Sequence, residues 1–283
     1  MTQGFQEAKG VMLQTWRGWN AHNGRRIGAA LAYYTAFSMA PILIIAIAVA
    51  GTVFGADAAR DEVSHQMQGL LGAEGAEAVQ AMITNAHGDG SGVIATVIGA
   101  VTLLLGASSL FGELQSALNL IWNAPAPKKH GIGVLVRARV MSFAMVLVIG
   151  FLLLVSLVVS ATLSGLQGTI GVQWSPLIAQ LVNLLVSLVV TTVLFALIFK
   201  VLPDVKVAWR DVAVGAFATA VMFALGKQLI GLYLGNSSVG SAYGAAGSFV
   251  VMLVWIFYSA QLILLGAEFT FAFAHRHDPP ASK

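Results

Sequence analysis

The sequence predicts an all-α, polytopic membrane protein with six transmembrane helices, a cytoplasmic N-terminal amphipathic helix and an external helical cap between the first two spans. Hydrophobic residues account for 58% of the 283 residues and charged residues for only 10%, whereas about a quarter of the residues in a soluble domain are charged. Long apolar stretches recur along the chain, each sufficient to cross roughly 30 Å of hydrocarbon. Basic residues gather in alternate connections between these stretches, which is typical of a multi-pass protein.

Residues 1–26 are expected to form a helix that lies in the cytoplasmic interface of the membrane. Apolar and aromatic residues recur there at helical spacing, and basic residues lie toward the other side. The two groups are Phe5, Met12, Trp16 and Trp19, and Lys9 and Arg17. We expect the tryptophans to lie at head-group depth. The alternative is a solvated helix that packs on the protein's own loops.

The membrane domain is predicted to cover residues 27–275, and a short cytoplasmic tail follows at 276–283. Its six spans are placed at 29–54, 93–122, 138–163, 177–201, 210–234 and 244–273. The third and fourth spans are nearly free of polar groups and should face lipid or be deeply packed. The other four carry polar residues and are expected to line an interior, because a polar side chain in lipid turns toward protein or water.

The basic residues predict the orientation of the chain. They lie before the first span, between the second and third, between the fourth and fifth, and after the sixth: Lys9, Arg17, Arg25, Arg26, Lys128, Lys129, Arg137, Arg139, Lys200, Lys206, Arg210, Arg276 and Lys283. On the opposite side only Arg60 lies in a loop. The positive-inside rule therefore predicts that both termini are cytoplasmic. Because the same asymmetry accounts for the basic composition, no nucleic-acid partner is expected.

The longest loop, residues 55–92, is predicted to be an acidic external cap made of two short amphipathic helices. Its acidic residues face a single basic one, Arg60: Asp57, Asp61, Glu62, Glu74, Glu77 and Asp89. Apolar residues at helical spacing occur on both sides of Gly72 and Gly75. We expect these helices to cover the outer mouth of the bundle.

Two carboxylates are expected inside the membrane, Glu113 in the second span and Glu268 in the sixth. A carboxylate at the centre of a span costs on the order of 2.5–3.5 kcal/mol unless it is paired, protonated or hydrated. Four arginines lie toward the same side, namely Arg25, Arg26, Arg137 and Arg139. Two interpretations stay open: an ion-pair network that fixes the register of the helices, or a hydrated site for a polar head group or a coupling ion.

Lys227 lies deep in the fifth span and toward the external side. It can extend outward to the acidic cap, or it can face a cavity and contact an anionic ligand. Tyr243 is either an interface aromatic or part of a cavity lining. In the first span, Tyr34 precedes Pro41, which predicts a kinked helix that is either simply packed or acts as a gating hinge.

Enzymatic constellations are largely missing from the sequence. The chain has no cysteine, which excludes disulfides, cysteine-ligated metals and thiol catalysis. No phosphate-binding loop and no nucleophile elbow occur. The histidines of the external loop and of the C-terminal tail, His65, His87, His275 and His277, follow no recognised metal-ligand spacing. We therefore expect a protein that is not an enzyme and that carries no cofactor and no metal.

Four stretches together resemble the YihY/BrkB family, once labelled ribonuclease BN. They are GAALAYYTAFSMAP, GASSLFGELQSALNLIW, LPDVKVAWRDVAVGA and YGAAGSFVVMLVWIFYSAQLILLGAEFTFAF, and the resemblance extends from about Trp16 to Phe273. It implies a bacterial inner-membrane protein with six spans and cytosolic ends. It also implies a link to virulence, serum resistance and envelope lipid handling, while the old ribonuclease label is regarded as a misassignment. Five residues match positions in the family's motifs without a role that could be transferred: Glu113, Asn119, Tyr243, Gly244 and Glu268.

The expected function is that of a transporter or flippase-like protein for an anionic amphipathic envelope molecule, such as a lipid or lipid precursor. A non-transporting membrane scaffold in envelope maintenance is the alternative, and a membrane-associated ribonuclease is a remote one. Membrane lipids with anionic head groups are the expected partners, and a homo-oligomer is compatible with the small residues of the second span. The candidate substrate-binding residues are Glu113, Asn119, Arg137, Arg139, Lys227, Glu268, Arg25, Arg26, Tyr34 and Tyr243.

Overall fold

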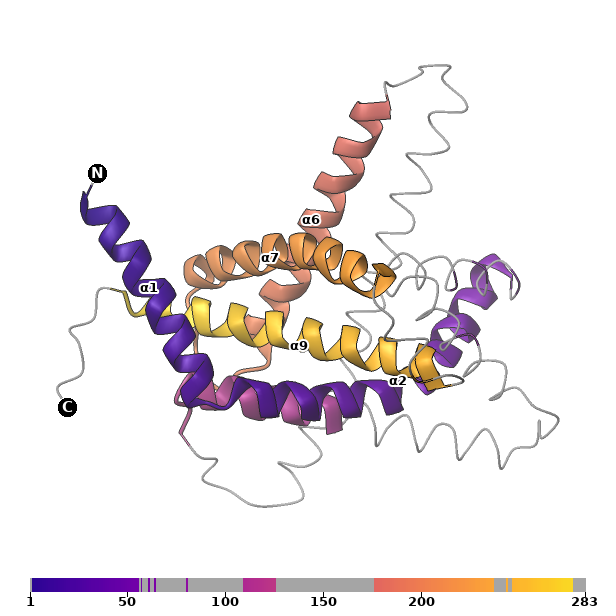
Figure 1. The fold of residues 1–283 in the computed structure, drawn as a ribbon, viewed down its shortest axis with the longest axis horizontal. Helices are drawn as coiled ribbons and strands as arrows, with labels where there is room; N and C mark the ends of the chain where they lie inside the picture. The colour runs from indigo at the N-terminus through magenta and orange to yellow at the C-terminus, as the bar shows by residue number, and fades with distance from the viewer. Residues whose placement is uncertain are drawn as a thin grey trace.

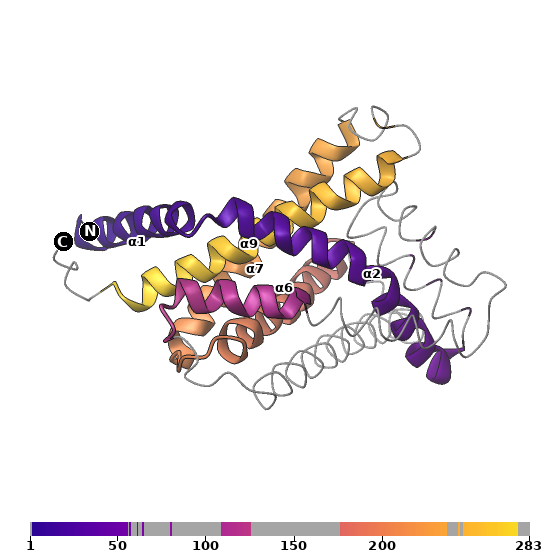
Figure 2. The same ribbon diagram turned by 90° about the horizontal axis from the view of Figure 1, so that it is seen from below.

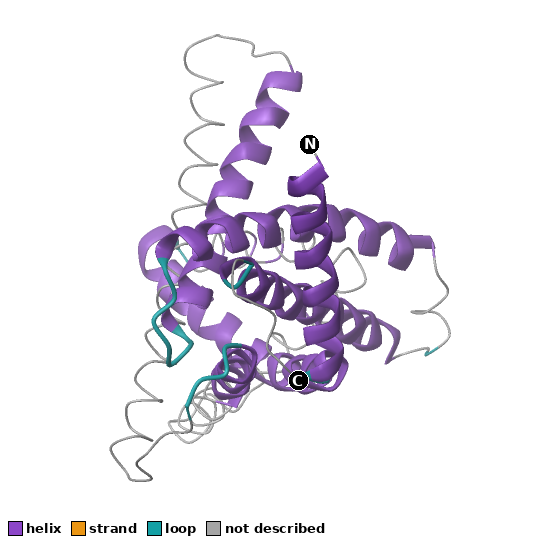
Figure 3. Ribbon diagram, turned by 90° about the vertical axis from the view of Figure 1, so that its left-hand side faces the viewer, coloured by secondary structure: helices purple, strands orange, loops and turns teal. Residues whose placement is uncertain are grey.

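The computed structural model describes residues 2–55, 109–125, 176–236 and 246–276, together with the single positions Asp57, Asp61, Ser64, Gln80 and Tyr243. Within these residues the regular structure is helical, without strands (Figures 1 and 3). The third predicted span, most of the second and nearly all of the external cap lie outside the described residues. Arg137 and Arg139 lie outside them as well.

The first two helices follow each other almost without a linker. Helix α1 covers Thr2–Ala21 and helix α2 covers Gly24–Phe54. The turn between them places Asn23 at a φ of 56°, in the left-handed region that asparagine tolerates better than most residues. The carbonyl of Asn23 accepts hydrogen bonds from the backbone N–H groups of Arg26 and Ile27, at 2.9 and 3.2 Å, so the turn leads directly into α2.

Three further helices form the second half of the described chain. Helix α6 covers Pro176–Val201, α7 covers Trp209–Asn236 and α9 covers Gly247–Ala274. These bounds agree with the predicted fourth, fifth and sixth spans to within three residues. The described residues contain three helical segments long and apolar enough to cross a membrane: Leu184–Val201, Trp209–Tyr233 and Phe249–Ala274.

Helix α9 is the central element of this arrangement. It packs against α7 on one side and against α2 on the other, while α6 crosses α7 and packs against it. Figure 1 shows α9 running between α7 and α2, and α1 crossing the end of α9 at an angle. The contacts of α1 are with α9 and α2. The first helix of the chain is therefore docked on the last one.

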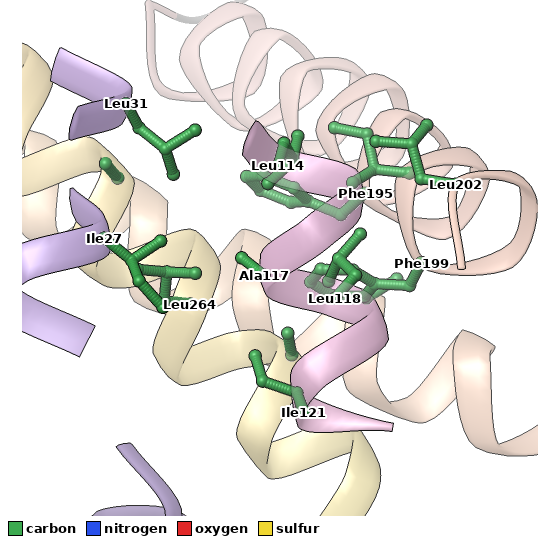
Figure 4. Close-up of a cluster of buried hydrophobic side chains, with 14 of the residues drawn as sticks. Ile27, Leu31, Leu114, Ala117, Leu118, Ile121, Phe195, Phe199, Leu202 and Leu264 are labelled. Carbon is green, nitrogen blue, oxygen red and sulfur yellow. The ribbon is translucent and has the colours of Figure 1, made fainter. Parts of the chain in front are cut away.

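A helical segment at residues 109–121 completes the core. Leu118 and Ile121 from this segment are fully buried and lie in one cluster with Phe199 of α6 and Leu264 of α9. Figure 4 shows this segment between α6 and α9, with Ile27 of α2 on the opposite side of Leu264. The end of the second predicted span therefore joins the two halves of the bundle through apolar contacts, which provide most of the driving force for packing.

Helices α7 and α9 approach each other through two matched pairs of small residues. A Cβ atom on Gly215 would lie 1.9 Å from Oγ1 of Thr270, and one on Gly266 would lie 2.1 Å from Oγ1 of Thr219. Each threonine hydroxyl donates a hydrogen bond of 2.7 Å within its own helix, Thr219 to the carbonyl of Gly215 and Thr270 to that of Gly266. The hydroxyls are thus satisfied without a partner on the other helix, and close van der Waals contact can hold the pair together.

The outer surface of the bundle is apolar, as expected for helices that face lipid. On α6 most of the exposed residues lie between positions 181 and 193, with Val201 at its very end exposed as well, whereas Phe195, Ile198 and Phe199 are buried. On α7 the exposed residues include Phe217, Leu225, Leu229 and Leu232. Helix α6 is therefore both lipid-facing and deeply packed, with the two properties separated along its length.

Candidate functional site

The polar contacts of the described chain gather at one end of the bundle, which we call the α1 end. It comprises the α1–α2 turn, residues 122–125 after the helical segment, the α6–α7 connection at 202–208, and His275 and Arg276 after α9. Figure 2 shows α1 and the end of α9 on this side of the molecule. Residues 122–125 contribute Trp122, whose ring meets that of Phe271 edge-on at 5.4 Å, and each of the other three pieces contributes a side chain to a contact described below.

Glu268 is the most deeply buried charged residue at the α1 end. Only 3% of it is exposed, on the face of α9 that contacts α1. Its Oε1 lies 2.6 Å from Nδ1 of His22 in the α1–α2 turn, which makes a short charge-assisted contact when the imidazole is protonated. A Cβ on Gly18 would lie 2.3 Å from the other carboxylate oxygen, so the absence of a side chain at Gly18 is what admits Glu268 beneath α1.

A second polar side chain of α9, Gln261, joins the same turn two helical turns away from Glu268. Its Oε1 accepts a hydrogen bond of 3.1 Å from the indole N–H of Trp19, and its amide group donates one of 3.4 Å to the carbonyl of Gly24. A Cβ on Gly28 would lie 1.8 Å from the amide nitrogen of Gln261. Residues seven apart lie on nearly the same face of a helix, so Gln261 and Glu268 together attach α1 and the start of α2 to α9.

Asp204, in the α6–α7 connection, is bound by the helical segment at 109–121. Asn119 donates a hydrogen bond of 2.8 Å from Nδ2 to the carboxylate of Asp204, and its Oδ1 accepts one of 2.8 Å from the backbone N–H of Asp204. The amide of Gln115, one turn earlier, lies 3.3 Å from both carboxylate oxygens. The amide side chain of Asn119 thus satisfies the side chain and the backbone of Asp204 at once.

Replacing Asn119 with leucine is expected to loosen the α6–α7 connection. The change removes two hydrogen bonds to Asp204, one of them to a charged group, and should lower the free energy of unfolding by about 1–3 kcal/mol. Reversible unfolding in mixed micelles would measure this loss. Ser116→Ala is the matched control, because Ser116 is exposed and, among the described residues, its hydroxyl bonds only to the carbonyl of Gly112 within its own helix. Equal stability of the two variants would contradict the assignment.

Two weaker contacts close the α1 end around α7. The ammonium of Lys200 lies 5.3 Å from the ring centroid of Trp209 and donates a hydrogen bond to the carbonyl of Val207, across the α6–α7 connection. Arg276, after α9, lies 3.9 Å from the carboxylate of Asp211. Both members of that ion pair are partly exposed, so it contributes on the order of 0–1 kcal/mol.

The arginines at the start of α2 do not pair with Glu268. Arg25 and Arg26 are both exposed, and the guanidinium of Arg25 lies 5.4 Å above the ring of Trp19. Glu268 is paired with His22 instead, a residue that neither charge nor spacing singles out. His22 lies in the turn, within reach of the buried carboxylate, whereas the two arginines lie beyond the turn on α2.

Glu113 and Lys227 differ from the other charged candidates because no described residue pairs with them. Glu113 is partly exposed on the helical segment at 109–121. Lys227 is partly buried in α7, about 27 Å along the helix from Trp209 and about 14 Å from Asn236. In the described part of the chain, neither has a hydrogen bond or an ion pair.

The two aromatic candidates lie apart from this set. Tyr34 is partly buried in α2, its ring edge-on to that of Tyr33 at 5.6 Å, and its carbonyl accepts a hydrogen bond of 2.6 Å from the hydroxyl of Ser38. Tyr243 is 60% exposed. The structure therefore brings Glu268 and Asn119 to the α1 end, each with a protein partner, and leaves Tyr34, Tyr243 and Lys227 elsewhere.

Three features of the α1 end were not predicted from the sequence. They are the role of His22, the role of Gln261, and the binding of Asp204 by Asn119. The spacing held one usable signal, because Gln261 and Glu268 are polar residues seven apart in an otherwise apolar helix. His22 gave none, since its contact joins residues 246 positions apart. Among the described residues, no group of three or more metal-ligating side chains comes together.

The apolar helices, their lipid-facing surface and the polar contacts at one end define a helical membrane protein. Residues 15–283 match the family described as virulence factor BrkB. The chain belongs to this BrkB family.

Several curated relatives are named UPF0761 membrane proteins. The one from Alkalilimnicola ehrlichii is 28% identical over 256 residues, covering 87% of this chain and 54% of the relative. The one from Rhodospirillum centenum is 30% identical over 257 residues, covering 90% and 55%. The one from Alteromonas mediterranea is 27% identical over 245 residues, covering 85% and 79%. The chain thus spans about half the length of the first two relatives, and no solved structure matches it.

Proposed function

We propose that this protein moves an anionic amphipathic envelope molecule, such as a lipid or lipid precursor, across the bacterial inner membrane, with both of its termini in the cytoplasm. The observation that carries the proposal is the state of Lys227. It is a cation within an apolar segment long enough to cross a membrane, and no described residue pairs with it. A lysine at the centre of a span costs on the order of 2.5–3.5 kcal/mol, and Lys227 lies about 9 Å inside the end of its segment at Tyr233.

Glu268 provides a contrast with Lys227. Glu268 has His22, so the stability of the fold is enough to explain its presence. Lys227 has no such explanation, and it stands among exposed leucines of α7, Leu225 and Leu229. A side chain that extends along this surface can meet the phosphate of a lipid whose acyl chains stay in the bilayer. An ionised phosphate would also offset the cost of the lysine's position.

Lipid movement can be tested in liposomes that contain the full chain and a trace of fluorescent lipid. Wild-type protein is expected to move labelled phosphatidylglycerol, and Lys227→Gln to slow that movement about tenfold, since a charge-assisted hydrogen bond contributes about 1.5–3 kcal/mol. Lys227→Arg should retain activity because it keeps the charge. Movement no faster than in empty vesicles, or full activity in Lys227→Gln, would overturn the proposal.

A non-transporting scaffold is the second candidate, and one observation favours it. The acids at the α1 end are engaged in internal contacts, namely Glu268, Asp204 and Asp211, whereas four basic residues there are exposed: Arg25, Arg26, Lys206 and Arg210. Such a face suits an acidic partner. A scaffold should cause no lipid movement in the vesicles. It should also co-purify with one acidic envelope protein, stoichiometrically and in a salt-sensitive manner. This co-purification should be lost when the four basic residues are replaced by glutamine.

A further inference from the structure

We propose that the start of α2 is a docking site for one anionic phospholipid, whose head group is bound by Arg25 and Arg26 and whose acyl chain lies along an exposed ridge of the same helix. This site is separate from Lys227 and does not require that the protein move lipid. Its occupant is a membrane lipid with a phosphate diester and a net negative charge.

Arg25 is held ready for an anion. Its guanidinium lies over the ring of Trp19, 5.4 Å from the centroid, and Trp19 is itself fixed by the hydrogen bond of 3.1 Å to Gln261. This cation–π contact uses no N–H group of the guanidinium as a hydrogen-bond donor, so these groups can bind phosphate oxygens. Arg26 follows on the exposed surface of the helix. Within the described chain, neither arginine has a hydrogen bond or an ion pair through its side chain.

The nearest buried acid cannot neutralise these arginines. Glu268 lies beneath the turn with only 3% of it exposed, and its Oε1 is committed to His22. The positive charge of Arg25 and Arg26 is therefore directed outward, which favours an anionic over a zwitterionic head group.

An exposed apolar ridge rises from Arg25. Ala29, Tyr33 and Phe37 follow it at intervals of four residues, and Tyr33 and Phe37 are 56% and 60% exposed with their ring centroids 4.6 Å apart. Residues four apart form a ridge on a helix. From Arg25 to Phe37 this ridge is about 18 Å long, close to the roughly 15 Å of hydrocarbon in one leaflet. The small side chain of Ala29 leaves room beside the head group, and the rings of Tyr33 and Phe37 offer a surface for the acyl chain.

The neighbouring surface of α1 places this site at the edge of the membrane. Met12, Leu13 and Trp16 form an exposed apolar strip on α1, with 71%, 47% and 52% of each residue accessible. Trp16 stacks on Trp19 at 5.1 Å, so the strip continues to the ring that supports Arg25. A tryptophan-bearing apolar strip beside arginines is typical of a helix at head-group depth, where a lipid phosphate is also found.

Native mass spectrometry of the full chain in detergent can count bound lipids and give their dissociation constants. Phosphatidylglycerol is expected to bind about tenfold more tightly than phosphatidylcholine with the same acyl chains. In the double variant Arg25→Gln/Arg26→Gln this preference should disappear. The matched control is Lys206→Gln/Arg210→Gln, which removes the same charge from exposed positions at the same end and should keep the preference.

A second variant covers the case in which the arginine double variant fails to fold. Ala29→Glu leaves Arg25 on Trp19 and puts a negative charge beside the head group, so it should also abolish the preference. Equal affinity of the wild type for the two lipids would overturn the proposal. Loss of the preference for phosphatidylglycerol in Lys206→Gln/Arg210→Gln, to the same extent as in the arginine double variant, would also overturn it. Displacement of the lipid by equimolar inorganic phosphate would show that the site takes free phosphate and not lipid. Because no lipid crosses a bilayer in this measurement, its outcome is independent of the liposome test on Lys227.

Discussion

Replacing Gly266 with alanine is expected to lower the free energy of unfolding by about 1–3 kcal/mol, the usual cost of inserting atoms into a filled interface. The new Cβ would lie 2.1 Å from Oγ1 and 2.6 Å from Cγ2 of Thr219, so one of the two helices must move. Thr219 is fully buried and its hydroxyl is bonded to Gly215, which prevents it from simply rotating away. Gly215→Ala should have the same effect through Thr270.

Helix α7 supplies the matched control. A Cβ on Gly231 would meet nothing within 4 Å. Gly231→Ala should therefore leave stability unchanged or raise it by up to about 1 kcal/mol through helix propensity. Unfolding in mixed micelles, followed by circular dichroism, would compare the variants. Exchanging the small residue across the interface, with Gly215→Ala and Thr270→Gly together, should recover part of the loss. If Gly266→Ala proved as stable as Gly231→Ala, close approach would not be what joins α7 to α9.

Replacing His22 with leucine is expected to cost about 3 kcal/mol, the effect of removing one partner from a buried ion pair. Glu268 would stay beneath α1 without the group that lies 2.6 Å away. Glu268→Gln should cost less, because a neutral amide oxygen can still accept a hydrogen bond from the imidazole. The double variant should lose less than the two single losses added together, since both changes remove the same interaction.

Limited proteolysis offers an independent measurement of the same contact. The His22→Leu protein should be cut faster near the α1–α2 turn, because α1 is held to α9 by the Glu268 and Gln261 contacts. Ser116→Ala is the control, since Ser116 is exposed and lies in the helical segment at 109–121, away from this turn. Equal cutting rates in wild type and His22→Leu would show that this ion pair does not hold α1 in place.

The helices of this protein follow closely from its sequence, for a physical reason. A long apolar stretch in a membrane must satisfy its backbone internally, so Trp209–Asn236 and Gly247–Ala274 could be placed to within a few residues of the predicted spans. The lipid-facing positions of α6 could also be predicted, because a run of leucines and valines without polar groups does not have to turn toward a polar interior. Length and hydropathy carry this information locally.

The contacts at the α1 end could not be predicted in the same way. The partner of Glu268 was sought among arginines, because charge alone suggested them, but distance selected His22. Nothing in the sequence connects Asp204 with Asn119, which binds it as part of the fold. Both contacts join residues far apart in the sequence, and they depend on the crossing of α1 over α9 and on the path of the α6–α7 connection. Neither is encoded in local spacing.

The turn at Asn23 has a mechanical consequence. Two residues connect α1 to α2 and leave no slack between them, so α1 acts as a lever about 30 Å long on the end of α2. A tilt of α2 by about 10° would displace the far end of α1 by roughly 5 Å. Because Gln261 and Glu268 of α9 hold the base of this lever, any tilt of α2 relative to α9 would strain their contacts with Trp19 and His22.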